Sequence, residues 1–514
     1  MGKNREKTEN RFNLIDEPWI PITDIGMVSL RRIFQDTTLR SLGGNPIQKI
    51  ALLKLLLAIC QSAYTPEDDD EWKKCGPKGL AKKALEYLEN HRDCFWLYGE
   101  NPFLQMPKIK ERIISRKKHE LDKGVKEPVA EANAKPKEIG LGYYPDIPSE
   151  NNTILTQDQI SHPVSDAEKA LFIVVLMNFA FGGKRVEKDI ALFSPGYTEK
   201  TVSAKSGPSL GNHWGYLHSF ITGTTIIETL WLNVFTQEYI DNNLNWEYKK
   251  IQAPWEKMPE GEDGEIARQL KNSYMGCLVA MCRFVLLEDD GIYYIEGIQY
   301  PSHKNGWREP SMCVDENTGK LLWTDPNKKP WRELTSLLAF LSTDENNKYS
   351  CPQLTNTLRR IKNMQMKIGI WSGGVRVRAN SGDQSIKQDD DFVESETFII
   401  SSYLEEGFPL LEKGMKHLES LSEYLKKIVF LYCDELNINA EPRKNKALDL
   451  YWQLCNREYQ HLVDACMVSD EEKAGKVEKL FIKFMRTAYE NCCPHDTARQ
   501  MQAWAGNYPV FKKQ

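Results

Sequence analysis

Apolar residues are grouped along the chain in ways that predict both helices and strands. The segments 46–64 and 166–181 are almost continuously apolar, which is typical of helices that are buried on all sides. Two further apolar runs, 283–288 and 292–300, flank Asp290-Gly291, and a short polar turn between such runs is a strong signal for a β-hairpin. The first part of the chain therefore predicts a mixture of buried helices and β-hairpins.

At about Glu396 the pattern changes to long amphipathic helices. Apolar residues then recur at steps of three and four, and the capping sequence 469–472 opens a further helix of this kind. The segment 398–404 is expected to supply a fourth helix. We therefore predict an α+β fold with two domains, which are a large mixed α/β domain with β-hairpins over residues 1–395 and an antiparallel four-helix bundle over residues 396–514.

Three polar segments interrupt the apolar pattern. The acidic run 67–71 is expected to be a solvated loop. Residues 107–144 are rich in lysine and arginine and poor in large apolar groups, which favours a mobile linker or lid, with contact to nucleic acid as the alternative. The segment 194–212 is rich in glycine, serine and proline, and a connection of this length without regular structure is more often functional than not.

Composition narrows the possible classes of protein. The net charge of −5 comes from 67 basic and 72 acidic side chains. Indiscriminate binding to nucleic acid needs a basic surface that releases counterions, so only local basic patches can serve here. The 12 cysteines lack metal-binding spacing and indicate reduced thiols in a cytoplasmic protein. The first residues lack an apolar signal core, and the longest apolar run is too short to cross a bilayer, so we expect no membrane association. We also expect no cofactor.

The segment 367–393 carries the most informative polar residues. Gly373-Gly374 interrupts an apolar run and permits close backbone approach. Arg376 and Arg378 alternate with valines, which favours an exposed strand with both guanidinium groups on one face. The tip of the polar turn that follows is expected to carry Asn380, Asp383 and Gln384. Such a hairpin could hold phosphates and probe or part bases, and an ordinary surface hairpin is the alternative.

A basic stripe lies on the predicted helix after residue 470. Its members recur at steps of three and four, which places them on one outer face: Lys476, Lys479, Lys483 and Arg486. The stripe is either an ordinary solvated helix face or a track for phosphates.

Motifs for catalysis are missing from the sequence. It contains no P-loop, no G-x-S-x-G and no H-E-x-x-H pattern. The adjacent aspartates 389–391 would point to alternate faces of a strand and would rarely converge on one metal ion. We therefore expect a protein that is not an enzyme.

Similarity to a known family is carried by four segments, which are FNLIDEPWIPI (12–22), SLRRIF (29–34), PIQKIALLKLLLAI (46–59) and NPFLQMP (101–107). They resemble the CasA family, the large subunit of type I-E CRISPR Cascade complexes. The remaining predicted elements follow in the order of that family. The resemblance implies a non-catalytic subunit of an RNA-guided surveillance complex.

By this resemblance the protein recognises the protospacer-adjacent motif of double-stranded DNA, nucleates strand opening for guide RNA pairing and helps recruit a helicase-nuclease. Its expected partners are the other Cascade subunits, the 5′ end of the guide CRISPR RNA at about 153–162, the target duplex and the recruited nuclease. A metal-dependent nuclease subunit and a purely structural scaffold are the alternatives.

The resemblance also implies three elements that contact DNA. A loop against the motif corresponds to Thr201, Val202, Ser203, Ala204 and Lys205, where this sequence is poorer in glycine than the family. A lysine on a β-hairpin that enters the minor groove corresponds to Lys304, within a turn predicted at 302–307.

The third element is a wedge that parts the duplex, and it follows the Gly-Gly-x-Arg sequence at 373–376. An ungapped count places 378–380 at the wedge, whereas a longer loop places Asp383, Gln384 and Ser385 there. Gln384 is preferred because it keeps the glutamine side chain. The zinc-binding cysteines of some relatives are not expected, because residues 287–291 join the flanking elements directly.

Overall fold

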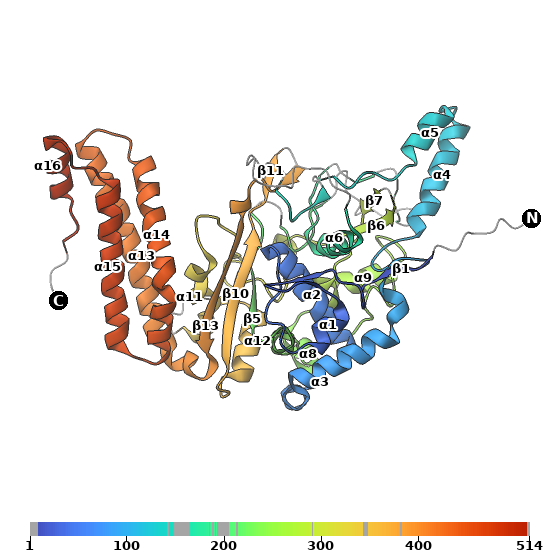
Figure 1. The fold of residues 1–514 in the computed structure, drawn as a ribbon, viewed down its shortest axis with the longest axis horizontal. Helices are drawn as coiled ribbons and strands as arrows, with labels where there is room; N and C mark the ends of the chain where they lie inside the picture. Colours follow the sequence, from blue (N-terminus) through green and yellow to red (C-terminus); the bar gives the residue numbers. More distant parts are fainter. Residues whose placement is uncertain are drawn as a thin grey trace, which may run out of the picture.

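Two long antiparallel strands form the spine of this α+β protein (Figure 1). In the computed structural model, β10 (Lys367–Val375) pairs along its whole length with β13 (Phe392–Ile400), and its other edge pairs with β5 (His218–Thr222). The sheet lies between the N-terminal body and the C-terminal helices, so both of its faces are covered. All of β10 except Lys367 is buried, and for this reason the strand shows no alternation of apolar and polar residues.

Shorter elements build the body around this sheet. The strands are β1 (Arg11–Asn13), β2 (Ile20–Ile22), β3 (Gly26–Val28), β4 (Trp96–Tyr98), β8 (Val314–Asp315) and β9 (Tyr349–Ser350). The helices include α1 (Leu30–Gln35), α7 (Ile226–Asn233), α8 (Gln237–Asn243), α9 (Glu265–Lys271), α10 (Tyr274–Leu278), α11 (Leu334–Leu337) and α12 (Pro352–Ile361). The structure describes residues 9–140, 143–148, 164–183, 186–187, 190, 192, 205–211, 214–289, 291–342, 348–380 and 383–510.

Both predicted core helices are confirmed. α2 (Pro46–Ala63) and α6 (Asp166–Phe179) each begin at a capping box, in which Asn45 and Ser165 accept hydrogen bonds from the first backbone N–H groups. By length and composition α2 could cross a membrane, but 78% of it is buried inside the protein, as in the core helix of a globular fold.

The predicted β-hairpin is confirmed as well. β6 (Arg283–Glu288) pairs with β7 (Gly291–Glu296) in a register that runs from Arg283 opposite Glu296 to Glu288 opposite Gly291. A Cβ atom at Gly291 would lie 2.4 Å from the carbonyl oxygen of Lys137, so glycine allows a neighbouring chain segment to approach the start of β7.

The acidic run 67–71 is not a solvated loop, because its last residues begin helix α3 (Asp69–Asn90). Asp68 is the N-cap, and its carboxylate accepts a hydrogen bond of 2.8 Å from the backbone N–H of Glu71. Negative charge at a helix N-terminus stabilises the helix through its dipole. The acidic cluster therefore serves helix initiation.

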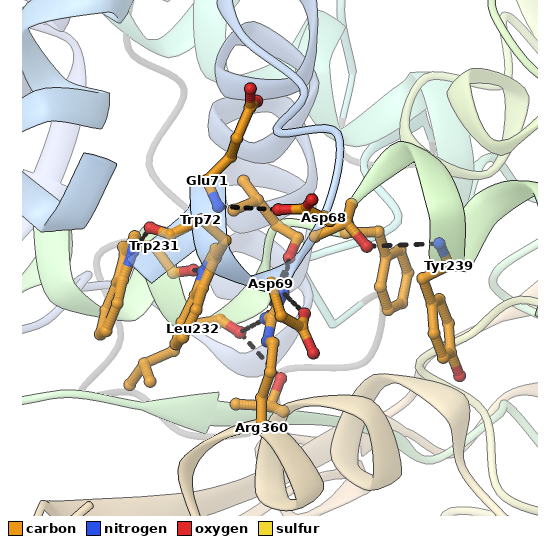
Figure 2. A network of polar contacts seen from close by, with 12 residues as sticks. Asp68, Asp69, Glu71, Trp72, Trp231, Leu232, Tyr239 and Arg360 are labelled. Carbon is orange, nitrogen blue, oxygen red and sulfur yellow. Dashed lines mark hydrogen bonds and ion pairs between the residues drawn. The ribbon is translucent and has the colours of Figure 1, made fainter. Parts of the chain in front are cut away.

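A stack of two tryptophans holds this helix start against α7 (Figure 2). The rings of Trp72 and Trp231 lie 4.0 Å apart, and each indole N–H donates to the other residue's backbone carbonyl. The Arg360 guanidinium lies 4.1 Å from the Trp72 ring and donates to the carbonyl oxygens of Leu232 and Val234. Burial lowers the pKa of Arg360 to about 10, which shows how fully this cation is removed from water.

Residues 107–144 were predicted to be a mobile linker or lid, and this prediction is wrong for the part that forms helices α4 (Lys108–Asp122) and α5 (Glu127–Asn133). The two helices project from the body in Figure 1. Ile109 and Ile113 bury the inner face of α4, and Arg116 donates to Glu187 at 2.9 Å. Few apolar residues suffice here because only one face of α4 is covered.

The C-terminal helices are α13 (Leu404–Glu435), α14 (Glu441–Met467), α15 (Glu471–Cys492) and α16 (Ala498–Gly506). The fourth helix was expected from 398–404, but most of that segment is the end of β13 and a 3-10 turn. The short α16 is the fourth helix instead and packs on α13. β13 also runs across the expected domain boundary at 395, so the helix series begins at Leu404.

An aromatic contact joins the helix series to the body. Trp331 is 2% exposed, stacks on Tyr459 of α14 with ring centroids 4.3 Å apart, and donates its indole N–H to Asn456. The neighbouring Arg332 lies 3.5 Å from the ring centroid of Trp452 and contacts the carboxylate of Glu419. The two parts of the chain therefore share one hydrophobic core.

Candidate nucleic-acid interface

Residues 205–211 are the described part of the glycine- and serine-rich connection. They are anchored to the body at Lys205 and at Gly207. Arg283 of β6 is 3% exposed, and its guanidinium donates to the carbonyl oxygens of Lys205 at 2.5 Å and Phe181 at 2.7 Å. Gly207 lies against the end of α6, where a Cβ atom would be 2.3 Å from the carbonyl oxygen of Asn178. The Lys205 side chain itself is exposed.

A buried charge network fixes the middle of this segment. The Lys54 ammonium of α2 lies 2.8 Å from both Ser209 Oγ and Glu309 Oε2, and the Lys54 and Glu309 side chains are 2% and 1% exposed. His218 Nε2 lies 2.9 Å from the Ser209 carbonyl oxygen and therefore donates to it, so Nδ1 accepts from the Ser311 hydroxyl. Burial lowers the pKa of His218, which keeps this imidazole neutral.

Gln384 contacts the other end of the segment, at Gly211. The sequence predicted that Gln384 lies at an exposed tip, and this prediction is wrong. Its side chain is 5% exposed. Its Oε1 accepts from the Gly182 backbone N–H at 2.8 Å, and its Nε2 donates to the Gly211 carbonyl oxygen at 2.9 Å. Gln384 belongs to the small hairpin of β11 (Arg378–Asn380) and β12 (Asp383–Ser385), in which Asp383 is exposed and Ser385 half-buried. Neighbours on a strand point to opposite faces, so the exposed Asp383 places Gln384 inside.

The glycine pair also has an internal role. Gly373 and Gly374 lie inside β10, and a Cβ atom at Gly374 would be 2.5 Å from the carbonyl oxygen of Tyr216. The close approach that the sequence predicted is therefore between segments of this protein itself, and both glycines are buried.

Arg376 and Arg378 follow β10 but do not form one continuous strand, because β10 ends at Val375 and β11 begins at Arg378. The Arg376 guanidinium lies 4.6 Å from the ring centroid of Trp214, which is 47% exposed. Arg378 is half-buried and lies 3.2 Å from the buried carboxylate of Asp391. The backbone N–H of Arg376 donates to the Asp391 carbonyl oxygen, so both arginines contact Asp391, one through its backbone and one through its side chain.

Lys304 is exposed, but it lies on a 3-10 turn (His303–Asn305) and not on a β-hairpin. Ser302–Gly306 closes as a tight turn, with Gly306 in the left-handed region at φ +94°. His303 Nδ1 lies 2.9 Å from the hydroxyl of Tyr216, and this contact ties the turn to the chain beside β10. Arg376 therefore lies beside Trp214, and Lys304 follows the residue that contacts Tyr216.

The predicted stripe lies on α15, as expected. Lys476, Lys479 and Lys483 are exposed and Arg486 is half-buried. Lys476 pairs with Glu472 at 2.6 Å and lines a groove of about 590 Å³ between α14 and α15, whose lining also includes Glu458, His461 and Asp464. The end of the stripe near Lys476 is therefore partly neutralised, and Lys479 and Lys483 carry most of its exposed charge.

Several predicted residues lie outside the described part of the chain or outside any site. Thr201, Val202, Ser203, Ala204 and the segment 153–162 are not among the described residues. The side chain of Asn380 is likewise not described. Asp389–Asp391 form a 3-10 turn and not a strand, and the Asp391 carboxylate accepts from the backbone N–H groups of Lys387 and Gln388. No group of three metal-ligating side chains occurs among the described residues.

Sequence reasoning missed Trp214 and the Lys54–Glu309 pair. Trp214 stands next to Gly215 at the end of the glycine- and serine-rich connection, and a large aromatic residue in such a polar segment is a usable signal. Lys54 interrupts the apolar run of α2, which marks a buried charge in need of a partner. The partner Glu309 stands 255 residues further along the chain and has no local signal.

Solved structures with the same arrangement identify the class of fold. The chain superposes on CasA of Thermus thermophilus with a TM-score of 0.63 at 19% identity, covering 97% of this chain and 98% of that one. For Cse1 of Thermobifida fusca the TM-score is 0.67 at 18% identity, covering 98% and 97%. A chain from a structure described as a CRISPR RNA-guided surveillance complex gives 0.65 at 14% identity, covering 97% and 99%. These likenesses establish a Cse1-like fold.

Sequence comparison gives the family. Residues 13–491 match the model of the CRISPR-associated protein Cse1 family, and the chain belongs to that family. The CasA/Cse1 protein of Thermus thermophilus is 34% identical over 114 residues, which span 20% of this chain and 22% of that protein.

Proposed function

We propose that this chain is the non-catalytic large subunit of an RNA-guided CRISPR surveillance complex, in which it recognises the protospacer-adjacent motif in double-stranded DNA. The observation that carries the proposal is the family match over residues 13–491, joined to the shared fold with a chain of an RNA-guided surveillance complex. Its partners are then the other Cascade subunits, the 5′ end of the guide RNA and the target duplex. It nucleates strand opening and helps recruit a helicase-nuclease.

The geometry supports a local contact with DNA better than a broad one. The net charge of −5 disfavours general binding to a polyanion, whereas Arg376 contacts Trp214 and Lys304 follows the residue that contacts Tyr216. A few local cations suit a short motif, because they neutralise only a few phosphates. Base pairing with the guide RNA then reads the remaining sequence.

A gel-shift titration tests this proposal, with duplexes that carry the motif or a scrambled motif. We expect the isolated chain to bind both duplexes weakly, and the assembled complex to bind only the motif-bearing duplex tightly. Cleavage of DNA by the isolated chain with Mg²⁺ would favour a nuclease, and binding by the complex that ignores the motif would favour a scaffold. Either result would contradict the proposed function.

A second experiment separates motif binding from strand opening. We expect Lys304→Ala to weaken binding to fully paired DNA and to DNA that is pre-melted beside the motif, because a minor-groove lysine acts in the encounter with closed duplex. Gln384→Ala combined with Asn380→Ala should slow opening of paired DNA only, since both residues belong to the β11–β12 hairpin. Equal defects of this double variant on both substrates would place the hairpin away from the opening point.

Because the Gln384 amide is bonded to Gly182 and Gly211, this variant needs a control for folding. Gln384→Glu retains the acceptor for the Gly182 N–H but loses the donor to Gly211. Thermal unfolding of both variants, measured beside the opening rates, separates loss of hairpin position from loss of the fold.

A further inference from the structure

Trp214 is an exposed aromatic side chain beside Arg376. Other tryptophans such as Trp19, Trp72 and Trp331 are buried almost completely, whereas Trp214 is 47% exposed. The Arg376 guanidinium lies 4.6 Å from its ring centroid. A cation over an indole face is attracted to the ring and favours one orientation of it. The contact leaves nearly half of the side chain open to solvent.

The backbone beneath Trp214 is held closely against the end of β10. Gly215 has φ +70°, and a Cβ atom there would lie 1.8 Å from the carbonyl oxygen of Val375. Thr324 donates its backbone N–H to the Gly215 carbonyl oxygen at 3.0 Å. Only glycine fits this position, and these contacts hold the backbone next to Trp214 in place.

The surroundings of Trp214 provide the chemistry that recognises a nucleic-acid strand. Arg376 contacts the Trp214 ring, Arg378 begins β11 two residues further on, and Lys304 follows His303, which contacts Tyr216. Aromatic faces stack on bases of any sequence, and neighbouring cations hold the phosphates. The Gln384 side chain is not available to contact a base, because its amide oxygen and its amide nitrogen are both hydrogen-bonded inside the protein.

We propose that Trp214 stacks on a nucleobase where the DNA duplex opens beside the motif, with Arg376 orienting the indole and Gln384 holding the hairpin next to it. This inference rests on the proposed function and assigns its base-contacting side chain. The ligand class is an unpaired base, or the last base pair, of target DNA. Gln384 is then a positioning residue, and Trp214 is the residue that touches the base.

The test uses the assembled complex and a motif-bearing duplex with 2-aminopurine at the first base pair to open. In the wild type, opening followed by stacking on the indole should raise and then quench the fluorescence. Trp214→Ala should slow opening between about fivefold and a hundredfold, the range that corresponds to loss of one base–aromatic stack. Pre-melting should restore the rate, and the quenched state should remain absent. Trp214→Phe should keep most of the rate and the quenching.

Phe398 provides a matched control at the opposite end of the strand pair. It is 44% exposed, and the Lys367 ammonium lies 5.8 Å from its ring centroid. Phe398→Ala should leave opening and quenching unchanged. Wild-type opening and quenching in Trp214→Ala, or equal defects in Trp214→Ala and Trp214→Phe, would overturn the stacking role. If the wild-type complex itself failed to open motif-bearing DNA, the proposed function would be at fault instead.

Discussion

Buried carboxyl groups occur in two different settings in this protein. Glu309 faces the Lys54 ammonium at 2.8 Å, so its charge is compensated in the core. Glu262 is 3% exposed, and its Oε2 atom has no hydrogen-bond partner among the described residues. Burial is the main cause that raises the pKa of Glu262, the charges of Glu296 and Asp263 add to it, and the resulting pKa is about 8. Glu262 therefore stays protonated in the folded chain near neutral pH.

This protonation makes stability depend on pH. Between the unfolded pKa of about 4.3 and the folded pKa of Glu262, the folded state holds a proton that the unfolded state releases, so stability falls as pH rises. Glu262→Gln removes this dependence. Each pH unit between these two pKa values is worth about 1.4 kcal/mol, so we expect the free energy of unfolding of the variant relative to wild type to rise by about 4 kcal/mol between pH 5 and pH 8.

Urea unfolding at several pH values between 5 and 8 measures this difference. The exposed neighbour Glu260 supplies the control, since Glu260→Gln should leave the slope of stability against pH as in the wild type. If Glu262→Gln kept the wild-type slope, the carboxyl group would be ionised in the folded state.

Single residues also show where sequence reasoning stops. The resemblance selected Gln384 as the wedge, and the small hairpin around it was predicted, but its burial was not. Its partners Gly182 and Gly211 stand 202 and 173 residues away in the sequence. A hydrogen bond across such a separation has no periodic signal, whereas a strand or helix repeats its pattern over neighbouring residues.

At the scale of elements, the pattern of apolar residues predicted helices and strands most accurately where the element is long and buried. α2, α6 and the β6–β7 hairpin have continuous apolar sequences and were predicted in type and place. α4 was missed because it buries only Ile109 and Ile113 among many charges. The helix start at Asp68 was missed because an acidic run suits both a loop and a helix N-terminus.

The stripe on α15 gives a prediction at this scale. Replacing Lys476, Lys479, Lys483 and Arg486 by glutamine should weaken target binding of the assembled complex to a similar degree for every motif. The salt dependence should also flatten, by about one unit of slope for each phosphate that the stripe no longer neutralises. We expect most of the effect from Lys479 and Lys483, because Lys476 is paired with Glu472.

Affinity titrations at several salt concentrations measure both quantities. Four exposed lysines of α3 provide a variant with the same number of charge-removing substitutions: Lys73, Lys74, Lys78 and Lys82. If both quadruple variants kept the wild-type affinity and slope, the stripe would be an ordinary solvated helix face.

At the scale of the molecule, the sequence pattern separates the body from the C-terminal helix series, but the two parts share one hydrophobic core. Trp331 of the body packs against residues of α14, so the body and the helix series should unfold together. Trp331→Ala removes the stack on Tyr459 and leaves a cavity, and we expect a loss of about 3–5 kcal/mol. Calorimetry should then resolve two transitions in place of the single wild-type transition. One sharp transition in Trp331→Ala would show that other contacts hold the parts together.

The continuous pairing of β10 with β13 has a mechanical consequence. One end of this ribbon carries Arg376 and the hairpin, and the other end enters α13 through a single 3-10 turn. Nine residues of strand span about 30 Å and resist stretching, because every residue is cross-linked to its neighbour by the ladder. We therefore expect a partner that tilts the helix series to displace the β11–β12 hairpin as well, because the paired strands connect the two.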